Sequence, residues 1–310
     1  MKKVFIDGSA GTTGLRIYER LESRSDITLI KLPEEKRKDI NARKQAINGA
    51  DIVFLCLPDD AARESVSLVQ NEDTVIIDTS TAHRTEKGWT YGFPELNGNI
   101  ANELKTSKRI AVPGCHASGF IALIYPLIAE GILPKESLLC CTSVTGFSGG
   151  GKKMIAEYGA EDRSALLDAP RQYGIAQQHK HLKEMKAVTG ITHFPAFSPI
   201  VSNFYSGMCV TVPIFASNLL NGKTAEDIKA VYESKYRGEI VKYTPSADET
   251  GFISAAKLSG LDSMEISVFG NNERILLAAR YDNLGKGASG AAVQCMNIAL
   301  GTDPTAGLNI

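Results

Sequence analysis

The sequence predicts an α/β protein with two domains. One is a Rossmann-like dinucleotide-binding domain with a parallel sheet, and the other is an α+β domain with a mixed sheet. A short apolar strand at 4–6 runs directly into a glycine loop and an amphipathic stretch, the order of elements that dinucleotide binding requires. Apolar runs at 51–57 and 74–78 lack alternation, which indicates strands buried on both faces. Later strand-like runs follow one another without crossover helices, which favours a mixed sheet.

The composition suits two domains of ordinary size and excludes several function classes. The chain has 310 residues, of which 43% are hydrophobic and 22% charged, and a formal net charge of -1. No basic run exceeds three residues, so we expect no nucleic-acid partner. We also expect no membrane partner, because no apolar run has the length of a membrane span. Six cysteines without CxxC spacing and a start without a signal peptide predict reduced thiols in a cytoplasmic protein.

The loop after the first strand carries glycines at 8, 11 and 14, a GxxGxxG spacing in place of GxGxxG. Gly11 and Gly14 would allow a pyrophosphate to approach the backbone at a helix N-terminus. A turn with a purely structural role is the alternative. We expect the loop to bind the cofactor through Gly8, Ser9, Ala10, Gly11, Thr12, Thr13 and Gly14.

The second strand, 27–32, indicates which dinucleotide binds. It ends without the acidic residue that holds the ribose of NAD and runs into the charged segment 33–38. Lys36 and Arg37 in that segment could accept a 2′-phosphate, so NADP is favoured over NAD. A solvated charged loop is the alternative.

Cys115 is the candidate nucleophile. A strand-like run at 109–112 leads through Pro113 and Gly114 to Cys115, and an apolar run at 120–128 follows. A thiol in the first turn of such a helix faces unpaired backbone N–H groups and the positive end of the helix dipole, both of which favour thiolate. A small apolar residue at a helix start is the alternative reading.

His179 and His181 are candidate proton carriers on a probable helix with Glu184. Two residues apart, they would point to different sides of that helix, so only one would share a site with Cys115 unless the helix begins between them. An imidazole can act as base and then as acid at neutral pH. No spacing of histidines and carboxylates fits a metal site, so we expect none. His116 is disfavoured as the base, because adjacent residues at a helix start diverge.

Other elements complete the predicted organisation. The segment 79–84 follows a strand at the sheet edge where ligands bind, which makes Ser80 a candidate cofactor contact and Arg84 a candidate anion clamp. A capping box opens a helix at 224–235, and a turn at 271–272 joins two strands in a hairpin. The last helix, 288–300, is expected to return to the first domain. We therefore assign 1–114 plus 287–310 to the NADP-binding domain and 115–286 to the catalytic domain.

Five segments carry a resemblance to a known family: GSAGTTG, YGFPEL, PGCHASGF, HKHLKEM and DNLGKGASGAAVQCMN. Together they resemble the N-acetyl-gamma-glutamyl-phosphate reductases, in particular the shorter, type 2 variant, over essentially the whole chain. The resemblance implies a semialdehyde-dehydrogenase-like fold and a homodimer or homotetramer. It also implies NADPH-dependent reduction of N-acetyl-glutamyl 5-phosphate to the 5-semialdehyde and phosphate, in arginine biosynthesis.

The resemblance also implies roles for individual residues. Cys115 would form a thioester with the acyl group, and His179 or His181 would move protons; the sequence leaves the choice between them open. By their positions in the motifs, the expected substrate contacts are Arg84, Ser148, Lys152 and Glu184, and Asn283 is expected on the nicotinamide side of the cofactor.

Two other functions remain compatible with the sequence. One is an aspartate-semialdehyde-type dehydrogenase, whose mechanism also proceeds through a cysteine thioester. The other is a non-catalytic regulator that senses dinucleotides. The sequence also leaves open whether the substrate carries an N-acetyl group or a carrier-protein amide.

Overall fold

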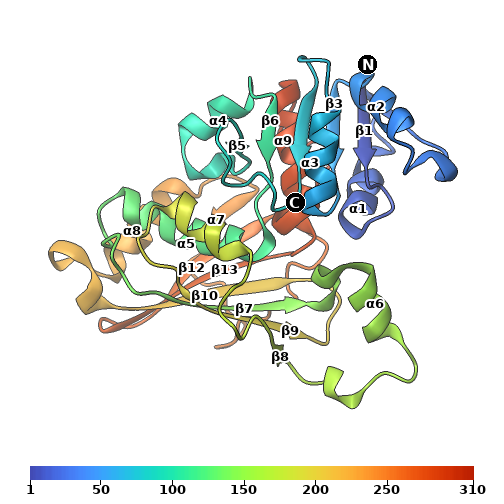
Figure 1. The fold of residues 1–310 in the computed structure, drawn as a ribbon. Coiled ribbons are helices and arrows are strands. Elements are labelled where there is room, and N and C mark those ends of the chain that lie inside the picture. The colour runs from blue at the N-terminus through green and yellow to red at the C-terminus, as the bar shows by residue number, and fades with distance from the viewer. The chain divides into compact units, whose positions relative to one another are not determined.

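The computed structural model describes residues 1–310 and divides them into two units (Figure 1). The first unit comprises Met1–Gly114 and Ala288–Asn309, and the second comprises Cys115–Gly287 with Ile310. None of the helices combines the length and apolarity needed to cross a membrane.

A six-stranded parallel sheet forms the centre of the first unit. Its strand order is β2-β1-β3-β4-β6-β5. Every residue of β3 and β4 is buried, which explains why their sequences are apolar without alternation. The strands are β1 (Lys2–Asp7), β2 (Ile27–Ile30), β3 (Ile52–Leu55), β4 (Val75–Asp78), β5 (Thr90–Tyr91) and β6 (Arg109–Ala111).

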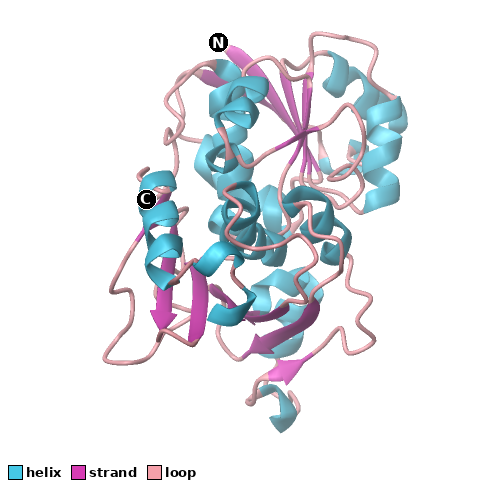
Figure 2. Cartoon of the chain, turned by 90° about the vertical axis from the view of Figure 1, so that its left-hand side faces the viewer, coloured by secondary structure: helices cyan, strands magenta, loops and turns pink.

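Helices cover both faces of this sheet. Figure 2 shows them on either side of the strands, with the sheet viewed along its edge. On one face, α1 (Thr12–Leu21), α4 (Gly98–Leu104) and α9 (Gly290–Leu300) share an apolar cluster with the strands. On the other face lie α2 (Ile40–Asn48) and α3 (Asp59–Ser67). The Rossmann-like, doubly wound arrangement predicted from the sequence is confirmed, and α9, red in Figure 1, completes it from the far end of the chain.

The second unit contains a seven-stranded mixed sheet of order β11-β12-β13-β10-β7-β9-β8. The pairs β7–β9 and β11–β12 are parallel and the other pairs are antiparallel. The predicted hairpin is present between β12 and β13. The strands are β7 (Cys140–Gly146), β8 (Arg171–Gln172), β9 (Ala196–Ser202), β10 (Met208–Phe215), β11 (Val241–Tyr243), β12 (Met264–Gly270) and β13 (Arg274–Tyr281).

Helix α5 (Cys115–Ala129) is the central helix of this unit and packs against β10, β13, α7 (His181–Thr189) and α8 (Ala225–Lys235). The predicted capping box opens α8 at Thr224. A further helix, α6 (Gly151–Gly159), follows a second glycine loop at 146–150. The sequence did not predict β5, β8, β9, α2, α4 or α6. Pro199 in the middle of β9 weakens its strand pattern, and α6 begins directly after a run of glycines.

Candidate active site

The glycines of the first loop allow a backbone turn with positive φ and the close packing of α1 on the loop. Gly8 has a φ of +88°, and a Cβ there would lie 2.3 Å from the carbonyl oxygen of Cys56. A Cβ on Gly14 would lie 2.4 Å from the carbonyl oxygen of Gly8, so close packing of α1 on the loop requires glycine. Gly11 precedes α1 as its N-cap and has a looser fit, with 3.3 Å to the same oxygen. This division matches the tight turn, the close phosphate approach and the helix packing of a dinucleotide fingerprint.

A cavity of about 900 Å³ opens at the carboxyl ends of β1 and β2. Gly8, Ser9 and Ala10 of the glycine loop line it, while Gly11, Thr12, Thr13 and Gly14 do not. Of the two cations predicted to face a 2′-phosphate, Arg37 lines the cavity and Lys36 does not. Lys38 and Lys31, which the sequence did not single out, line it as well. The cavity thus combines loop backbone and apolar side chains with charged groups of both signs, because Glu34 and Glu35 line it beside the cations.

An ion pair buried at the edge of this cavity was not predicted. The carboxylate of Asp7, at the end of β1, accepts hydrogen bonds from Arg43 of α2 and from the hydroxyl of Ser65 of α3. Arg43 also donates to the Ser65 oxygen at 2.6 Å. All three side chains are buried. The network holds α2 and α3 against the strand that leads into the glycine loop, and no sequence spacing signals it.

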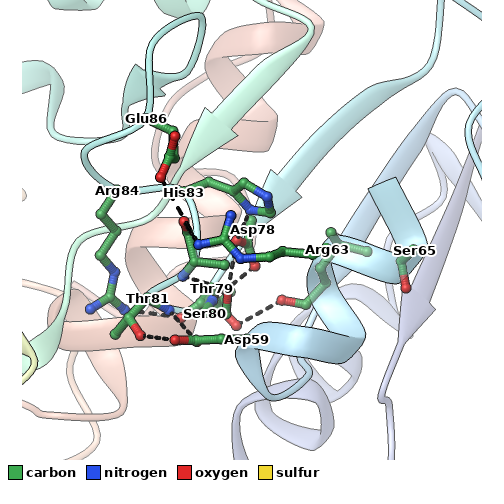
Figure 3. Close-up of polar contacts among 12 residues, drawn as sticks. Asp59, Arg63, Ser65, Asp78, Thr79, Ser80, Thr81, His83, Arg84 and Glu86 are labelled. Carbon is green, nitrogen blue, oxygen red and sulfur yellow. Dashed lines mark hydrogen bonds and ion pairs between the residues drawn. The ribbon is translucent and has the colours of Figure 1, made fainter. Parts of the chain in front are cut away.

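The segment after β4 folds over the end of that strand (Figure 3). The carboxylate of Asp78 accepts hydrogen bonds from the backbone and hydroxyl of Ser80 and contacts Nδ1 of His83 at 2.6 Å. The His83 ring stacks on Trp89 with centroids 4.1 Å apart. The Ser80 hydroxyl donates its proton to Asp78. In the predicted contact with the cofactor, the Ser80 oxygen would therefore accept a hydrogen bond.

Arg84, predicted as an anion clamp, ties the ends of two strands together. Its Nε donates to the carbonyl of Val112 and its Nη2 to the carbonyl of Thr79. These carbonyls directly follow β6 and β4. Arg84 therefore fixes the chain three residues before Cys115, in addition to the anion binding that the sequence predicts.

Cys115 is the first residue of α5 and is half-buried. The hydroxyl of Tyr281 donates to the carbonyl of Cys115 and accepts the N–H of Gly119, which holds the first helical turn. A Cβ on Gly287 would lie 3.2 Å from Cβ of Cys115, so the segment around Gly287 closes on the cysteine. The thiol is thus placed where the helix N-terminus favours the thiolate.

The placement of the two histidines corrects the prediction of a shared helix. Helix α7 begins at His181, so His179 precedes it and the helix begins between them. Their ring centroids are 4.8 Å apart, and the ring of His116 lies 5.6 Å from His179 and 5.5 Å from His181. Burial, and then the charge of Lys180, lower the pKa of His179 below its usual range. Both histidines therefore belong to one cluster beside the first turn of α5.

His116 is the centre of this cluster. It is 3% exposed, its Nδ1 lies 2.7 Å from Oγ of Ser143, and its Nε2 lies 2.6 Å from the hydroxyl of Tyr173. Burial, and then His179, lower the pKa of His116 to about 3. A ring that stays neutral at working pH and has both nitrogens engaged is a poor general base. Tyr173, which nothing in the sequence singled out, joins the site through it.

The remaining predicted contacts lie in the second unit. Asn283 accepts the N–H of Gly207 and donates to the hydroxyl of Ser148, so both predicted residues hold the second glycine loop. Lys152 is exposed near the start of α6. Glu184 is buried in the first turn of α7, three residues after His181. Their contacts with substrate or cofactor stay predictions.

Comparison with known proteins decides the family. Residues 3–105 match the family model of the semialdehyde dehydrogenase NAD binding domain, and residues 115–283 match that of the semialdehyde dehydrogenase dimerisation domain. The chain is 44% identical to N-acetyl-gamma-glutamyl-phosphate reductase 2 of Nostoc sp. (strain PCC 7120), with 99% of each chain covered. It is 43% identical to N-acetyl-gamma-glutamyl-phosphate reductase of Mesorhizobium japonicum, covering 96% of this chain and 99% of the relative. The chain belongs to the N-acetyl-gamma-glutamyl-phosphate reductase family.

Solved structures show the same fold as this reductase. Aspartate semialdehyde dehydrogenase II of Vibrio cholerae, complexed with ASA, matches with a TM-score of 0.72 at 17% identity, covering 97% of this chain and 98% of that one. The aspartate semialdehyde dehydrogenase of Francisella tularensis also matches with a TM-score of 0.72, at 16% identity, covering 96% and 99%. The predicted semialdehyde-dehydrogenase-like fold is confirmed.

The low pKa of His116 predicts that the folded reductase loses stability in acid. The unfolded chain binds a proton at this residue near pH 6.5, whereas the folded protein binds it only near pH 3. The contribution of His116 to the free energy of unfolding is therefore complete above pH 6.5. It decreases as the pH falls, by about 2–3 kcal/mol at pH 4.5. Urea unfolding at pH 7 and pH 4.5 measures it. His116→Gln should reduce the pH dependence, and an unchanged dependence would refute the assignment; exposed His193→Gln is the matched control.

Proposed function

We propose that this chain is an NADPH-dependent reductase that converts N-acetyl-glutamyl 5-phosphate to N-acetyl-glutamate 5-semialdehyde and phosphate in arginine biosynthesis. The observation that carries the proposal is the placement of Cys115 at the start of a buried helix, beside a cluster that contains two histidines. The names of relatives 43–44% identical over nearly the whole chain support the substrate.

Cys115 supplies the nucleophile. Its thiolate attacks the carbonyl of the acyl phosphate, the carbon–oxygen bond to phosphate breaks, and a thioester remains on the sulfur. The positive end of the α5 helix dipole favours the thiolate before attack. The contacts of Tyr281 with Cys115 and Gly119 keep this turn in place during the attack.

His179 and His181 have different capacities for handling protons. Nδ1 of His179 accepts the backbone N–H of His181 at 3.3 Å, so the neutral ring carries its proton on Nε2 and serves as a hydrogen-bond donor. Its lowered pKa keeps it in that neutral form at working pH. We assign His179 to hydrogen bonding of the acyl oxygen and His181 to proton transfer as the aldehyde forms and leaves.

The first unit fits a nicotinamide dinucleotide. The glycine loop provides the close backbone approach that a pyrophosphate needs, and the cavity beside it is lined by Lys31, Arg37 and Lys38. These cations support NADP over NAD. When bound, the reduced cofactor supplies the hydride that takes the thioester to the aldehyde level.

The matched dimerisation model supports assembly of copies of this chain, as a homodimer or homotetramer. Six free cysteines suit a reducing compartment, and we expect the enzyme in the cytoplasm.

Replacing Cys115 by serine should abolish turnover and leave NADPH binding intact, because only the nucleophile is lost. The measurement uses NADP, phosphate and a panel of semialdehydes and follows absorbance of the reduced cofactor. The wild-type enzyme should prefer N-acetyl-glutamate semialdehyde. Preference for aspartate semialdehyde would favour the aspartate-type dehydrogenase, and tight cofactor binding without turnover would favour the regulator. Exposed Cys140→Ser is the matched control, and wild-type activity in Cys115→Ser would contradict the mechanism.

The two histidines should respond differently to replacement by glutamine. His181→Gln should lower kcat by about 10²–10⁴-fold and flatten the pH profile of kcat, because a general acid–base group is lost. His179→Gln keeps a side-chain hydrogen-bond donor, so its kcat should fall much less. Steady-state rates between pH 6 and 9 test this assignment, and the opposite ranking of the two variants would reverse it.

Reversing the charge of Arg37 should impair use of NADPH selectively. Arg37→Glu removes a charge-assisted hydrogen bond to the 2′-phosphate and adds repulsion, so the KM for NADPH should rise about tenfold to a hundredfold. The KM for NADH, which lacks that phosphate, should change less than about threefold. Lys87→Glu is the control, because Lys87 is exposed in the same unit and does not line the cavity. An equal rise in KM for NADPH and NADH would show that Arg37 does not contact the 2′-phosphate.

A further inference from the structure

The side-chain amide of Gln177 forms two hydrogen bonds with the backbone of one strand residue. Its Nε2 donates to the carbonyl of Phe197 at 2.8 Å, and its Oε1 accepts the N–H of Phe197, also at 2.8 Å. A primary amide suits this contact, because it carries donors and an acceptor side by side, like the N–H and C=O of a strand residue. Phe197 lies on β9 and is 1% exposed, so water is a poor substitute partner for its backbone groups. We call this pair of hydrogen bonds the amide clamp.

The amide clamp lies at the edge of β9, beyond the point where β8 ends. The N–H of Tyr173, directly after β8, donates to the carbonyl of Pro199 at 3.0 Å. Phe197 lies two residues before Pro199 in β9, so its N–H and C=O face the same edge. The backbone then leaves this edge through a turn, closed by a hydrogen bond from the N–H of Gln177 to the carbonyl of Gly174. The side chain of Gln177 therefore takes the place that the next residue of β8 would occupy.

The backbone of Gln177 indicates that its side chain is the reason for glutamine at this position. Its φ is +55°, in the left-handed region that favours glycine and asparagine. A residue with a long side chain is held in this region only where other contacts offset the strain. The amide clamp supplies those contacts.

His179 follows two residues after Gln177 and depends on this segment for its position. Its ring centroid lies 5.2 Å from that of Phe197, the residue that the clamp holds, and 5.6 Å from that of His116. Its Nδ1 accepts the N–H of His181 at a long 3.3 Å, where α7 begins. The ring of His179 thus lies between two fixed points of the chain, the amide clamp before it and the start of α7 after it.

We propose that Gln177 is a positioning residue for the reaction. By binding the edge of β9, it holds His179 where the Nε2 proton of the ring reaches the acyl oxygen of the substrate. The inference rests on the proposed function, which gives His179 that hydrogen bond. Gln177 acts through His179, and a displacement of a reacting group by about 1 Å is enough to lower a rate by about a hundredfold.

Gln177→Gly tests the proposal, because glycine keeps the left-handed backbone and removes the clamp. Steady-state rates are measured with NADP, phosphate and N-acetyl-glutamate semialdehyde. We expect kcat to fall about tenfold to a hundredfold and KM to change less than about threefold. Gln178→Gly is the matched control, because Gln178 is exposed, adjoins His179 and has no part in the clamp. Equal losses in the two variants would show that a loosened loop, and not the lost clamp, slows the enzyme, and would overturn the inference.

A double-mutant cycle separates positioning of His179 from a general structural role. In a His179→Ala background, the further change Gln177→Gly should alter kcat less than about twofold, because the side chain through which Gln177 acts is already absent. A loss as large as in the wild-type background would contradict the proposed route through His179.

Gln177→Glu provides a second variant with the same length and backbone demand. Its carboxylate accepts the N–H of Phe197 but has no proton to donate to the carbonyl, so kcat should again fall. It serves if Gln177→Gly fails to fold, which thermal unfolding detects. Wild-type kcat in the folded variants would refute the role of Gln177 and leave the proposed function intact. Turnover by Cys115→Ser would instead overturn the proposed function itself.

Discussion

The hydroxyl of Tyr281 is the contact on which the position of Cys115, the proposed nucleophile, depends. It joins the carbonyl of Cys115 to the N–H of Gly119, so one side chain from β13 holds the first turn of α5. A Cβ on Gly119 would lie 2.7 Å from both this hydroxyl and the side chain of Val210, so the approach requires glycine. Residues 116–124 of the helix are buried. The thiol is therefore presented by a helix that packing prevents from shifting.

Two buried carboxylates of the first unit are paired with polar side chains. Asp7 meets Arg43 and Ser65, and Asp78 meets Ser80 and His83. A buried carboxylate is tolerated only where such partners surround it, and removal of one partner leaves a costly unpaired group. These networks fix the loops that follow β1 and β4, where a parallel sheet presents its ligand-binding edge. Hydrogen bonds among buried side chains thus hold the two loops in place.

The sequence indicates a candidate site residue where its immediate neighbours carry the pattern and gives no signal where its partners are distant in the chain. Cys115 is a candidate because the residues on either side of it predict a helix start, and the structure begins α5 at this residue. The loop 33–38 was found as a cationic segment, but only its folded path decides that Arg37 and not Lys36 lines the cavity. Tyr173 gave no signal, because its hydrogen-bond partner His116 is 57 residues away in the chain. Local pattern carries no information about such pairings.

The sequence by itself determined the fold class, the glycine loop, the position of the cysteine and the family, because each is expressed in residues close together along the chain. Tertiary structure decided which histidine belongs to the helix, since α7 begins only at His181. It also decided that His116 is a neutral centre of hydrogen bonds and that Arg84 joins two strand ends. Burial and long-range hydrogen bonds set these properties, and both arise only when separate elements come together.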